Sequence, residues 1–439
     1  MAFTDLAIWM NGQHVGTWFW TRTGTPGLHY DASWTASPNA RPLSLSLPIP
    51  AGGADVMGPR VEHYFDNLLP DSGRIRERLR RRFGTSSIRA ADLLAAIGRD
   101  CVGAVQLMPV GTQPPAHDRI ESTALSEAEI ARLLGEVTND GPDRDTLAQD
   151  FRISIAGAQE KTALLKIGEN WHLPAGATPT THIFKLPLGL IGNMRADMTE
   201  SVENEWLCAS VLRALGFEVA QTEMGQFNGS KALIVERFDR RWMNDGQWIA
   251  RLPQEDFCQA TGIAGEQKYE SDGGPGIRAG LALLSGGNQA KANSLHFIQA
   301  QLAFWLLAAT DGHAKNFSIF LERGGGYRMT PLYDVISAWP VIGTGARQIH
   351  PRRAKLAMAL RGKNAHYHLH EIRTRHWQQL ALQSGVPGAF DQMVALVLQV
   401  PDALERVATA LPKGFPASVF EPIRRGMLAQ AELFVDELD

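Results

Sequence analysis

The sequence predicts an α+β protein with two lobes and an additional β-rich module at the N-terminus. Short runs with period-two alternation fill residues 5–50, and further strand-like runs appear between 151 and 238. From residue 252 onward the apolar residues recur at helical spacing. We therefore expect a β-rich module over 1–110, a second lobe over 111–250 and a mostly α-helical lobe over 251–439.

The composition is that of a globular protein. Hydrophobic residues make up 44% of the 439 residues, charged residues 20%, and the formal net charge is −3. This charge argues against a protein that coats nucleic acid. The three cysteines form no disulfide framework or CxxC metal site, and no signal peptide or membrane span is apparent. A cytoplasmic location without membrane contact is expected.

The N-terminal module begins with a hairpin and includes a strongly basic helix. Asn11 and Gly12 form a hairpin turn signal, and residues 43–47 alternate like a further strand. Together these runs predict a small antiparallel barrel or curled sheet. Residues 74–82 hold six arginines on an amphipathic helical pattern. Their basic face is either solvated or in contact with an anionic surface.

The second lobe opens with a turn of small residues between two strands. Residues 151–155 and 162–167 have strand patterns, and the turn between them has little side-chain bulk. A backbone of this kind can approach phosphate groups and bind them through its N–H groups. A simple hairpin is the alternative, because Gly157 is the one glycine of the turn.

A lysine and a glutamate in this lobe match a pair known from kinases. Lys185 lies in a strand over 181–187 and precedes a helix that carries Glu203 and Glu205. In kinases such a pair positions the ATP phosphates. We favour Glu205 as the partner, and ordinary surface charges are the alternative. The strand over 232–238 ends where, in chain order, the hinge that binds adenine would follow.

The stretch 310–316 is the strongest candidate for catalysis. Asp311 and Asn316 are five positions apart, as are the Asp and Asn of a protein-kinase catalytic loop. In that loop the carboxylate accepts the proton of the attacking hydroxyl and the asparagine binds Mg²⁺. A capping or turn role for both residues is the alternative.

A hairpin after this stretch predicts a metal site. Strand-like runs over 317–321 and 327–333 flank a glycine-rich connection, and folding about Gly325 places Asn316 opposite Asp334. Directly opposed residues have Cα atoms roughly 4.5–5.5 Å apart, so both side chains can reach one cation.

Two other segments have weaker patterns. Residues 268–276 are rich in turn formers and are expected to be a surface loop or lid. Residues 352–375 are rich in Arg, Lys and His. For them we expect a solvated, partly disordered loop, with a docking surface as the alternative.

Several blocks of the sequence together resemble one family, the HipA serine/threonine kinase toxins of bacterial toxin–antitoxin pairs. The resemblance implies a two-lobed protein-kinase-like (HipA) fold with an N-terminal β-rich module, a nucleotide-binding N-lobe and an all-helical C-terminal lobe. The blocks appear in order over most of the chain. They are Arg41-Pro-Leu-Ser-Leu-Ser-Leu-Pro48, Phe65-Asp-Asn-Leu-Leu-Pro-Asp71, Ile153-Ser-Ile-Ala-Gly-Ala-Gln-Glu-Lys-Thr-Ala163, Val235-Glu-Arg-Phe-Asp-Arg-Arg241, Leu252-Pro-Gln-Glu-Asp256, Lys268-Tyr-Glu-Ser-Asp-Gly-Gly-Pro-Gly276 and the stretch 310–316.

The resemblance also implies roles for individual residues. ATP and Mg²⁺ would be the cofactors, Asp311 the catalytic aspartate, and Asn316 with Asp334 the metal ligands. Lys185 would contact the ATP phosphates, with Glu205 as its partner. Further ATP contacts would come from Ala156, Gly157, Ala158, Gln159, Glu160, Lys161, Glu236, Arg237, Phe238, His313, Lys315 and Tyr333.

The family further implies regulation and partners. Ser154 matches the site where members phosphorylate themselves, and the added charge of about −1.5 to −2 is expected to eject the phosphate-binding loop. The implied partner is a HipB-like helix-turn-helix antitoxin. The implied substrate is an aminoacyl-tRNA synthetase of the glutamyl type, with growth arrest and persistence as the outcome. The helix after Arg375 and His376 lacks the positive charges that some members use, so operator DNA is expected to be bound through the antitoxin.

Two other interpretations of the chain remain. One is a catalytically weak co-repressor that bridges antitoxin dimers on operator DNA. The intact set of Lys185, Asp311, Asn316 and Asp334 argues against it. The other is a small-molecule kinase of similar architecture, which the active-site residues alone do not exclude.

Overall fold

The computed structural model describes residues 4–114, 116–138, 154, 156–157, 159–192 and 195–438. The chain forms two compact units, and each is built from three separate stretches of sequence. The first unit comprises Met1–Leu186, Gly225–Glu266 and Ser318–Tyr327. The second comprises Pro187–Met224, Gln267–Phe317 and Arg328–Asp439. Because the chain passes between the units repeatedly, neither is a simple N- or C-terminal half.

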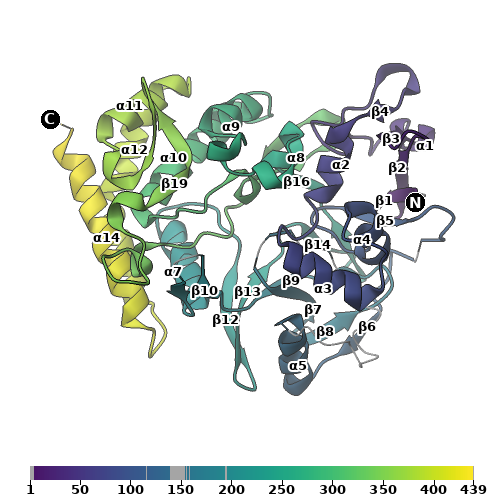
Figure 1. The fold of residues 1–439 in the computed structure, drawn as a ribbon, viewed down its shortest axis with the longest axis horizontal. Helices are drawn as coiled ribbons and strands as arrows, with labels where there is room; N and C mark the ends of the chain where they lie inside the picture. Colours follow the sequence, from purple (N-terminus) through teal and green to yellow (C-terminus); the bar gives the residue numbers. More distant parts are fainter. Residues whose placement is uncertain are drawn as a thin grey trace. The chain divides into compact units, whose positions relative to one another are not determined.

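The first unit begins with an antiparallel five-stranded sheet (Figure 1). Asn11 and Gly12 both have positive φ, 45° and 77°, as the central residues of a type I′ hairpin turn must. The hairpin predicted there is confirmed. The strand order is β4-β3-β2-β1-β5, with β1 (Leu6–Met10), β2 (Gln13–Trp20), β3 (Pro26–Tyr30), β4 (Val56–Met57) and β5 (Val105–Pro109).

Four helices pack with this sheet around one apolar core. They are α1 (Ala32–Thr35), α2 (Pro59–Asp66), α3 (Gly73–Phe83) and α4 (Ala90–Ile97). Trp18 of β2 stacks on Phe65 of α2 with ring centroids 4.1 Å apart. The strand predicted over 43–47 is wrong. This segment forms a turn closed by one bridge, and its alternation instead buries Leu43 and Leu47 while Ser44 and Ser46 donate to the backbone carbonyl of Gln259.

The basic helix α3 is capped at both ends and partly neutralised. The Ser72 hydroxyl accepts from the first turn, and Gly84 ends the helix with φ of 63°. Arg76 pairs with Asp66, N to O distance 2.6 Å, and Arg78 pairs with Glu160 at 2.8 Å. The face predicted to be solvated therefore binds acidic groups of the same unit in part.

A second sheet has the strand order β12-β13-β9-β7-β8-β6. Helix α5 (Glu127–Thr138) packs on it over a core that includes Phe184 and Ile234. The strands are β6 (Ser122–Ala124), β7 (Lys161–Ile167), β8 (Asn170–Pro174), β9 (His182–Lys185), β12 (Thr222–Phe227) and β13 (Ser230–Glu236). The chain continues through β14 (Arg240–Met243), β15 (Trp248–Arg251), β16 (Gln254–Asp256) and α8 (Phe257–Thr261), and β17 (Ser318–Leu321) lies between β16 and β18 (Tyr327–Met329).

The second unit is mainly helical, and it includes most of the residues of the α-helical lobe predicted over 251–439. Its central helix α10 (Ala290–Leu307) is buried along most of its length and packs against α9 (Ile277–Leu284), α11 (Thr374–Gln383), α12 (Ala389–Leu398) and α14 (Ala417–Asp436). The closing helix α14 is drawn in yellow in Figure 1. The other helices are α7 (Ser201–Ala214), α9 (Ile277–Leu284), α11 (Thr374–Gln383), α12 (Ala389–Leu398), α13 (Val400–Thr409) and α14 (Ala417–Asp436).

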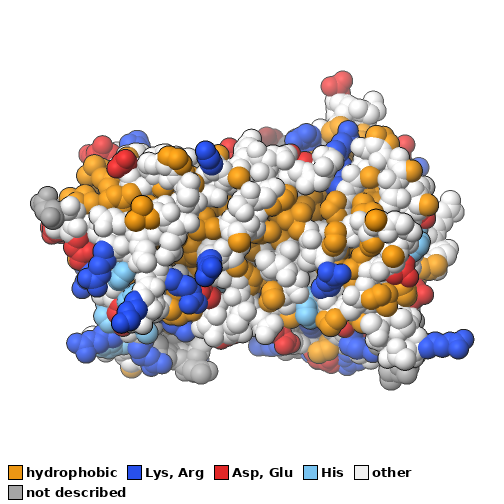
Figure 2. All heavy atoms as spheres, turned by 90° about the horizontal axis from the view of Figure 1, so that it is seen from above, with side chains coloured by type: hydrophobic (Ala, Val, Ile, Leu, Met, Phe, Trp, Pro, Cys, Tyr) orange, Lys and Arg blue, Asp and Glu red, His pale blue; other side chains and the backbone are white. Residues whose placement is uncertain are grey.

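Two short strand pairs complete this unit. They are β10 (Gly189–Ile191) with β11 (Ala196–Met198), and β19 (Lys355–Arg361) with β20 (Ala365–His368). The solvated loop predicted over 352–375 is wrong, because β19 buries Leu356 to Leu360 between exposed Lys355 and Arg361. Figure 2 shows basic and histidine side chains gathered toward the end of the view where α11, α12 and β19 lie in Figure 1. Among the described residues, no helix is long and apolar enough to cross a membrane.

Candidate functional site

The stretch 310–316 forms a tight connection after α10 in the second unit. Helix α10 ends at Ala308, which has φ of 47°. The carbonyl of Asp311 accepts from the backbone N–H of His313 at 2.8 Å, and the carbonyl of His313 accepts from that of Asn316 at 2.9 Å. Gly312 has no room for a side chain, because a Cβ there would lie 2.4 Å from the Phe304 ring. These bonds fix the backbone from Asp311 to the short 3₁₀ helix η4 (Ala314–Asn316).

Asn316 lies beside Asp334, the residue with which the sequence analysis grouped it. The Asn316 Nδ2 donates to the backbone carbonyl of Asp334 at 3.3 Å. The Tyr333 hydroxyl donates to the carbonyl of Lys315 at 2.8 Å and ties the same two segments together. Asp334 has φ of 60°, a left-handed backbone conformation that is uncommon for residues other than glycine. His313 and Lys315 are buried.

The oxygen atoms here fit a hard divalent cation. Asn316 Oδ1 is buried and has no hydrogen-bond partner in the described part of the chain. A buried acceptor normally has a partner, so this atom suits a cation that the protein does not itself supply. The half-buried Asp334 adds a carboxylate next to it. Mg²⁺ is commonly held by one or two such groups together with substrate phosphates, so Asn316 and Asp334 would be the protein ligands of such an ion.

The Asp311 side chain is exposed and contacts a residue that the sequence interpretation missed. The Tyr269 hydroxyl donates to Asp311 Oδ1 at 2.5 Å. The Tyr269 ring also meets the His313 ring edge-on, with centroids 5.0 Å apart. Tyr269 lies in the segment 268–276, whose sequence signals a turn but gives no indication of what the turn contacts.

In the first unit, Ser154 is buried and held by backbone groups. Its hydroxyl donates to the carbonyl of Leu68 at 2.8 Å, and its N–H donates to the carbonyl of Asp100 at 3.1 Å. The exposed fraction of Ser154 is 1%. A phosphate on this hydroxyl therefore requires the segment to leave its present place.

The predicted phosphate-binding turn is closed by its own lysine. Lys161 Nζ donates to the carbonyl of Ala156 at 2.8 Å, and the left-handed Gly157 (φ 110°) leaves no room for a Cβ beside that Nζ. Gln159 donates to the carbonyl of Leu186 at 2.5 Å, and Glu160 is the residue that pairs with Arg78. Ala158, also predicted to bind ATP, lies outside the described residues.

Lys185 and Glu205 lie in different units. Lys185 is buried near the end of β9, directly opposite Lys161 of β7 on one side and Leu233 of β13 on the other. Glu205 is buried in α7 of the second unit, as is Glu203. The lysine–glutamate pair expected from the sequence stays a prediction.

The predicted hinge residues have three different environments. Glu236 is exposed at the end of β13. The Phe238 ring packs edge-on against Phe320 with centroids 5.8 Å apart. The Arg237 side chain points away from solvent into a buried charged cluster, and its backbone N–H donates to the carbonyl of Thr181. Its guanidinium is therefore committed within the first unit.

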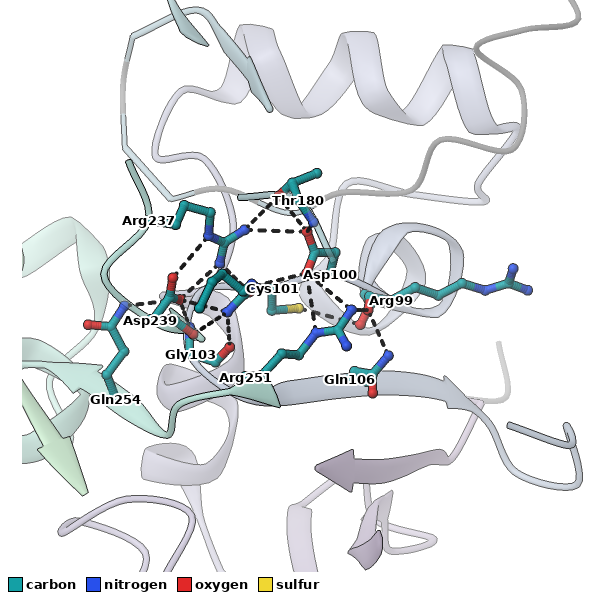
Figure 3. Close-up of polar contacts among 12 residues, drawn as sticks. Arg99, Asp100, Cys101, Gly103, Gln106, Thr180, Arg237, Asp239, Arg251 and Gln254 are labelled. Atoms are coloured by element: carbon teal, nitrogen blue, oxygen red, sulfur yellow. Dashed lines mark hydrogen bonds and ion pairs between the residues drawn. The ribbon is translucent and has the colours of Figure 1, made fainter. Parts of the chain in front are cut away.

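We call the group formed by Asp100, Arg237, Asp239, Arg240 and Arg251 the buried ion cluster. Arg237 bonds both carboxylates and Arg251 bonds Asp100 (Figure 3). The side chains are between 2% and 6% exposed. Burial alone would raise the pKa of Asp100, but the three arginines outweigh it and hold that pKa well below its usual range. Burial lowers the pKa of Arg251 to about 10 despite the attraction of Asp100.

Asp100 connects this cluster to the candidate nucleotide-binding segments of the same unit. Its carboxylate accepts from the N–H and hydroxyl of Thr180, just before β9, and its carbonyl accepts from Ser154. The cluster thus holds the starts of the Lys185 strand and of the phosphate-binding turn. Sequence patterns gave no indication of it, because charged residues are ordinarily exposed.

Comparison with known proteins gives consistent matches over nearly the whole chain. The family model of the HipA N-terminal domain matches residues 6–108, and that of the HipA-like C-terminal domain matches residues 153–408. The putative kinase Y4mE of Sinorhizobium fredii is 34% identical over 419 residues, which are 93% of this chain and 92% of the relative. The serine/threonine-protein kinase toxin HipA of Shewanella oneidensis is 28% identical over 330 residues, 71% and 70% of the two chains.

A solved structure has the same fold. The complex of HipA, HipB and operator DNA from Shewanella oneidensis MR-1 contains a chain that aligns with a TM-score of 0.80 at 24% identity. The alignment covers 98% of this chain and 97% of that one. This likeness confirms the fold class predicted from the sequence.

Proposed function

The chain belongs to the HipA family of serine/threonine-protein kinases, and from this premise we propose that it is an ATP- and Mg²⁺-dependent protein kinase that acts as the toxin of a type II toxin–antitoxin pair. The observation that carries the proposal is the buried Oδ1 of Asn316, which no group in the described ranges of the chain bonds. Asn316 lies beside Asp334 and five positions after an exposed aspartate. This is the minimum set of protein groups that phosphoryl transfer needs.

In this proposal the second unit supplies the chemistry. Asp311 accepts the proton of the attacking serine or threonine hydroxyl as phosphoryl transfer proceeds. Asn316 Oδ1 and the Asp334 carboxylate hold Mg²⁺, which neutralises charge on the ATP phosphates. His313, Lys315 and Tyr333 shape the adjoining wall of the nucleotide site.

The first unit supplies the nucleotide contacts. Backbone N–H groups of the turn from Ala156 to Lys161 bind phosphate oxygens. Lys185 contacts the phosphates with Glu205 as its partner. Backbone groups from Glu236 to Phe238 bind adenine, since the Arg237 side chain is committed to the buried ion cluster.

Ser154 serves as a self-inactivation site. Its hydroxyl donates to a backbone carbonyl in the present conformation, so phosphorylation replaces that bond with about −1.5 to −2 units of charge in a buried place. Such a charge forces the segment out and disassembles the phosphate-binding turn that follows it.

The proposed partners are those expected of the family. A HipB-like helix-turn-helix antitoxin binds the kinase and connects it to operator DNA. The similar chain from Shewanella oneidensis was solved in a complex with HipB and operator DNA, which supports the antitoxin as partner. The substrate is a protein needed for translation, an aminoacyl-tRNA synthetase of the glutamyl type, and its phosphorylation arrests growth and promotes persistence. These assignments place the protein in the bacterial cytoplasm.

The test is phosphoryl transfer by the wild type and by the Asp311→Ala variant. With labelled ATP, Mg²⁺ and an extract of cells that lack this kinase, the wild type labels protein, and the variant does so about 10²–10⁴-fold more slowly. Phosphoproteomics of cells that express either protein identifies the target, and the mass of the intact wild type reports phosphate on Ser154. The variant keeps the parent's melting temperature, because Asp311 is exposed.

Three results would count against the proposal. Equal rates for parent and variant would remove Asp311 from catalysis. Label in a metabolite in place of protein would indicate a small-molecule kinase. Failure of the unphosphorylated protein to bind Mg-ATP would favour the co-repressor that bridges antitoxin dimers.

A further inference from the structure

The segment 268–276 is attached directly to the catalytic stretch. The Tyr269 hydroxyl donates to Asp311 Oδ1 at 2.5 Å, and the Tyr269 ring packs edge-on against His313. One residue earlier, the carbonyl of Lys268 accepts from the backbone N–H of Ala314 at 3.2 Å. The segment therefore meets both the backbone and the reactive side chain of the stretch 310–316.

The other side of the segment is anchored to β19. The Glu270 carboxylate, with its side chain 7% exposed, accepts from the backbone N–H of Ala359 at 2.7 Å. It also accepts from Arg361 Nε at 2.9 Å and from the same guanidinium's terminal nitrogen at 2.5 Å. A carboxylate bound by a fork of two N–H groups and a backbone amide has a well-defined orientation. Glu270 immediately follows Tyr269, so this anchor also restrains the tyrosine.

The glycines of this segment are required by close packing. A Cβ at Gly274 would lie 1.9 Å from the carbonyl oxygen of Gln267, and one at Gly276 would lie 2.2 Å from the Glu270 carboxyl carbon. Gly273 has φ of 93°. The backbone N–H groups of Asp272 and Gly274 both donate to the Tyr269 carbonyl at 3.0 Å. The turn formers thus build a compact support around Tyr269, and the segment is a surface loop, as expected, that is held in place by these contacts.

We propose that Tyr269 is a positioning residue for the catalytic aspartate, an inference that rests on the proposed function of Asp311. Proton acceptance needs the Asp311 carboxylate in one orientation, because each unproductive rotamer slows a step that needs aligned reacting groups. The phenol hydroxyl selects one orientation of the carboxylate. Its rigid support makes that orientation available before the acceptor hydroxyl arrives. A carboxylate has about four lone-pair directions, so a donor on Oδ1 is compatible with proton acceptance by the same group.

The test is Tyr269→Phe, which removes one hydroxyl and keeps the ring against His313. Tyr367→Phe on β20 is the matched control, because it deletes the same group from the strand that pairs with the Glu270 anchor strand. The assay follows label from ATP into the protein of an extract of cells that lack this kinase, over a range of ATP concentrations. For Tyr269→Phe we expect kcat to fall about 10- to 100-fold, the rate equivalent of one hydrogen bond to a charged group. The KM for ATP and the melting temperature remain those of the parent, because phenylalanine keeps the ring against His313. The Tyr367→Phe control keeps the parental kcat.

Two comparisons make the result decisive. Glu270→Gln, which weakens the anchor and retains Tyr269, is expected to lower kcat by a smaller factor than Tyr269→Phe with the same KM for ATP. An unchanged kcat in Tyr269→Phe would overturn the inference. A higher kcat would also overturn it, because it is expected if the tyrosine hydroxyl only occupies the position of the substrate hydroxyl. A loss that appears in KM for ATP or melting temperature in place of kcat would do the same. Asp311→Ala, assayed in parallel, distinguishes failure of the proposed function from failure of this inference. A fully active Asp311→Ala variant would refute the proposed function itself. An inactive Asp311→Ala variant together with a fully active Tyr269→Phe variant would refute only the role of Tyr269.

Discussion

The buried ion cluster of the first unit and the catalytic stretch of the second treat polar groups in opposite ways. In the cluster, five charged side chains are almost fully removed from water and each is bonded to a partner of opposite charge. In the catalytic stretch, Asp311 is exposed and Asn316 buries an oxygen that no described group of the protein bonds.

The difference separates groups that hold the fold from groups reserved for a ligand. A buried charge is tolerated only when its partners replace water, and the cluster meets that condition with two carboxylates and three guanidiniums. A buried acceptor without a partner lowers stability, so it persists where a ligand uses it. Substitutions in the cluster should therefore act on stability, and substitutions in the stretch should act on rate.

Asp100→Asn gives the largest expected effect. It leaves three buried arginines with one carboxylate, and loss of one partner of a buried ion pair costs about 3–5 kcal/mol. Urea unfolding of the variant should show this loss. The control is Asp66→Asn, which breaks the Asp66–Arg76 pair at a carboxylate that is 29% exposed and should cost about 1 kcal/mol or less. Equal losses in the two variants would contradict the importance of burial.

Asn316→Ala should show the reverse pattern. We expect phosphoryl transfer to slow on the order of 10²-fold, because one metal-binding oxygen is lost, while the free energy of unfolding changes little. The contrasting variant is Asn204→Ala in α7. Asn204 exchanges hydrogen bonds of 2.8 and 2.9 Å with the backbone of Ser337, so its loss should cost about 1–3 kcal/mol and leave the rate per folded molecule unchanged. A stability loss without a rate loss in Asn316→Ala would place Asn316 with the structural groups.

The pH dependence of stability tests whether a buried carboxyl destabilises the fold when it has no partner of opposite charge among the residues that the structure describes, and Glu255 is the residue to use. This carboxyl of β16 is fully buried and accepts from the backbone N–H of Leu45 at 2.9 Å, and burial raises its pKa to about 8. Because the folded pKa lies above the unfolded value, stability from this group is complete at acid pH and is lost as pH rises through about 8. Glu255→Gln should therefore raise the melting temperature by a few degrees near pH 9 and leave it unchanged near pH 5. A pH-independent difference between parent and variant would show that the carboxyl titrates normally.

Local chemistry made part of the fold and site predictable from sequence. The turn at Asn11 and Gly12 needs positive φ, which few residues adopt readily, so it identified its hairpin. Asn316 and Asp334 flank one hairpin, and a hydrogen bond from the Asn316 amide to the Asp334 carbonyl joins them. In both cases, neighbouring residues in the chain determine the geometry.

The features that were missed depend on contacts between distant segments. Leu43 and Leu47 alternate like a strand, but they are buried from a turn closed by the Ser44–Leu47 bridge, and this burial gives the same pattern. β19 has an exposed charged residue at each end, so the sequence pattern did not indicate that its centre is buried. Asp100 and Tyr269 stand out only once residues about 140 and 42 positions away in sequence are placed beside them.

The left-handed backbone of Asp334 has a consequence for protein engineering. Glycine adopts a φ of 60° without steric cost, whereas aspartate does so only at some expense in conformational energy. A laboratory selection for heat resistance would thus enrich glycine at this position and discard the carboxylate that we assign to the metal. Variants that survive such a selection would be the most thermostable and the least active. Engineering this kinase for higher thermal stability should therefore keep residue 334 constant.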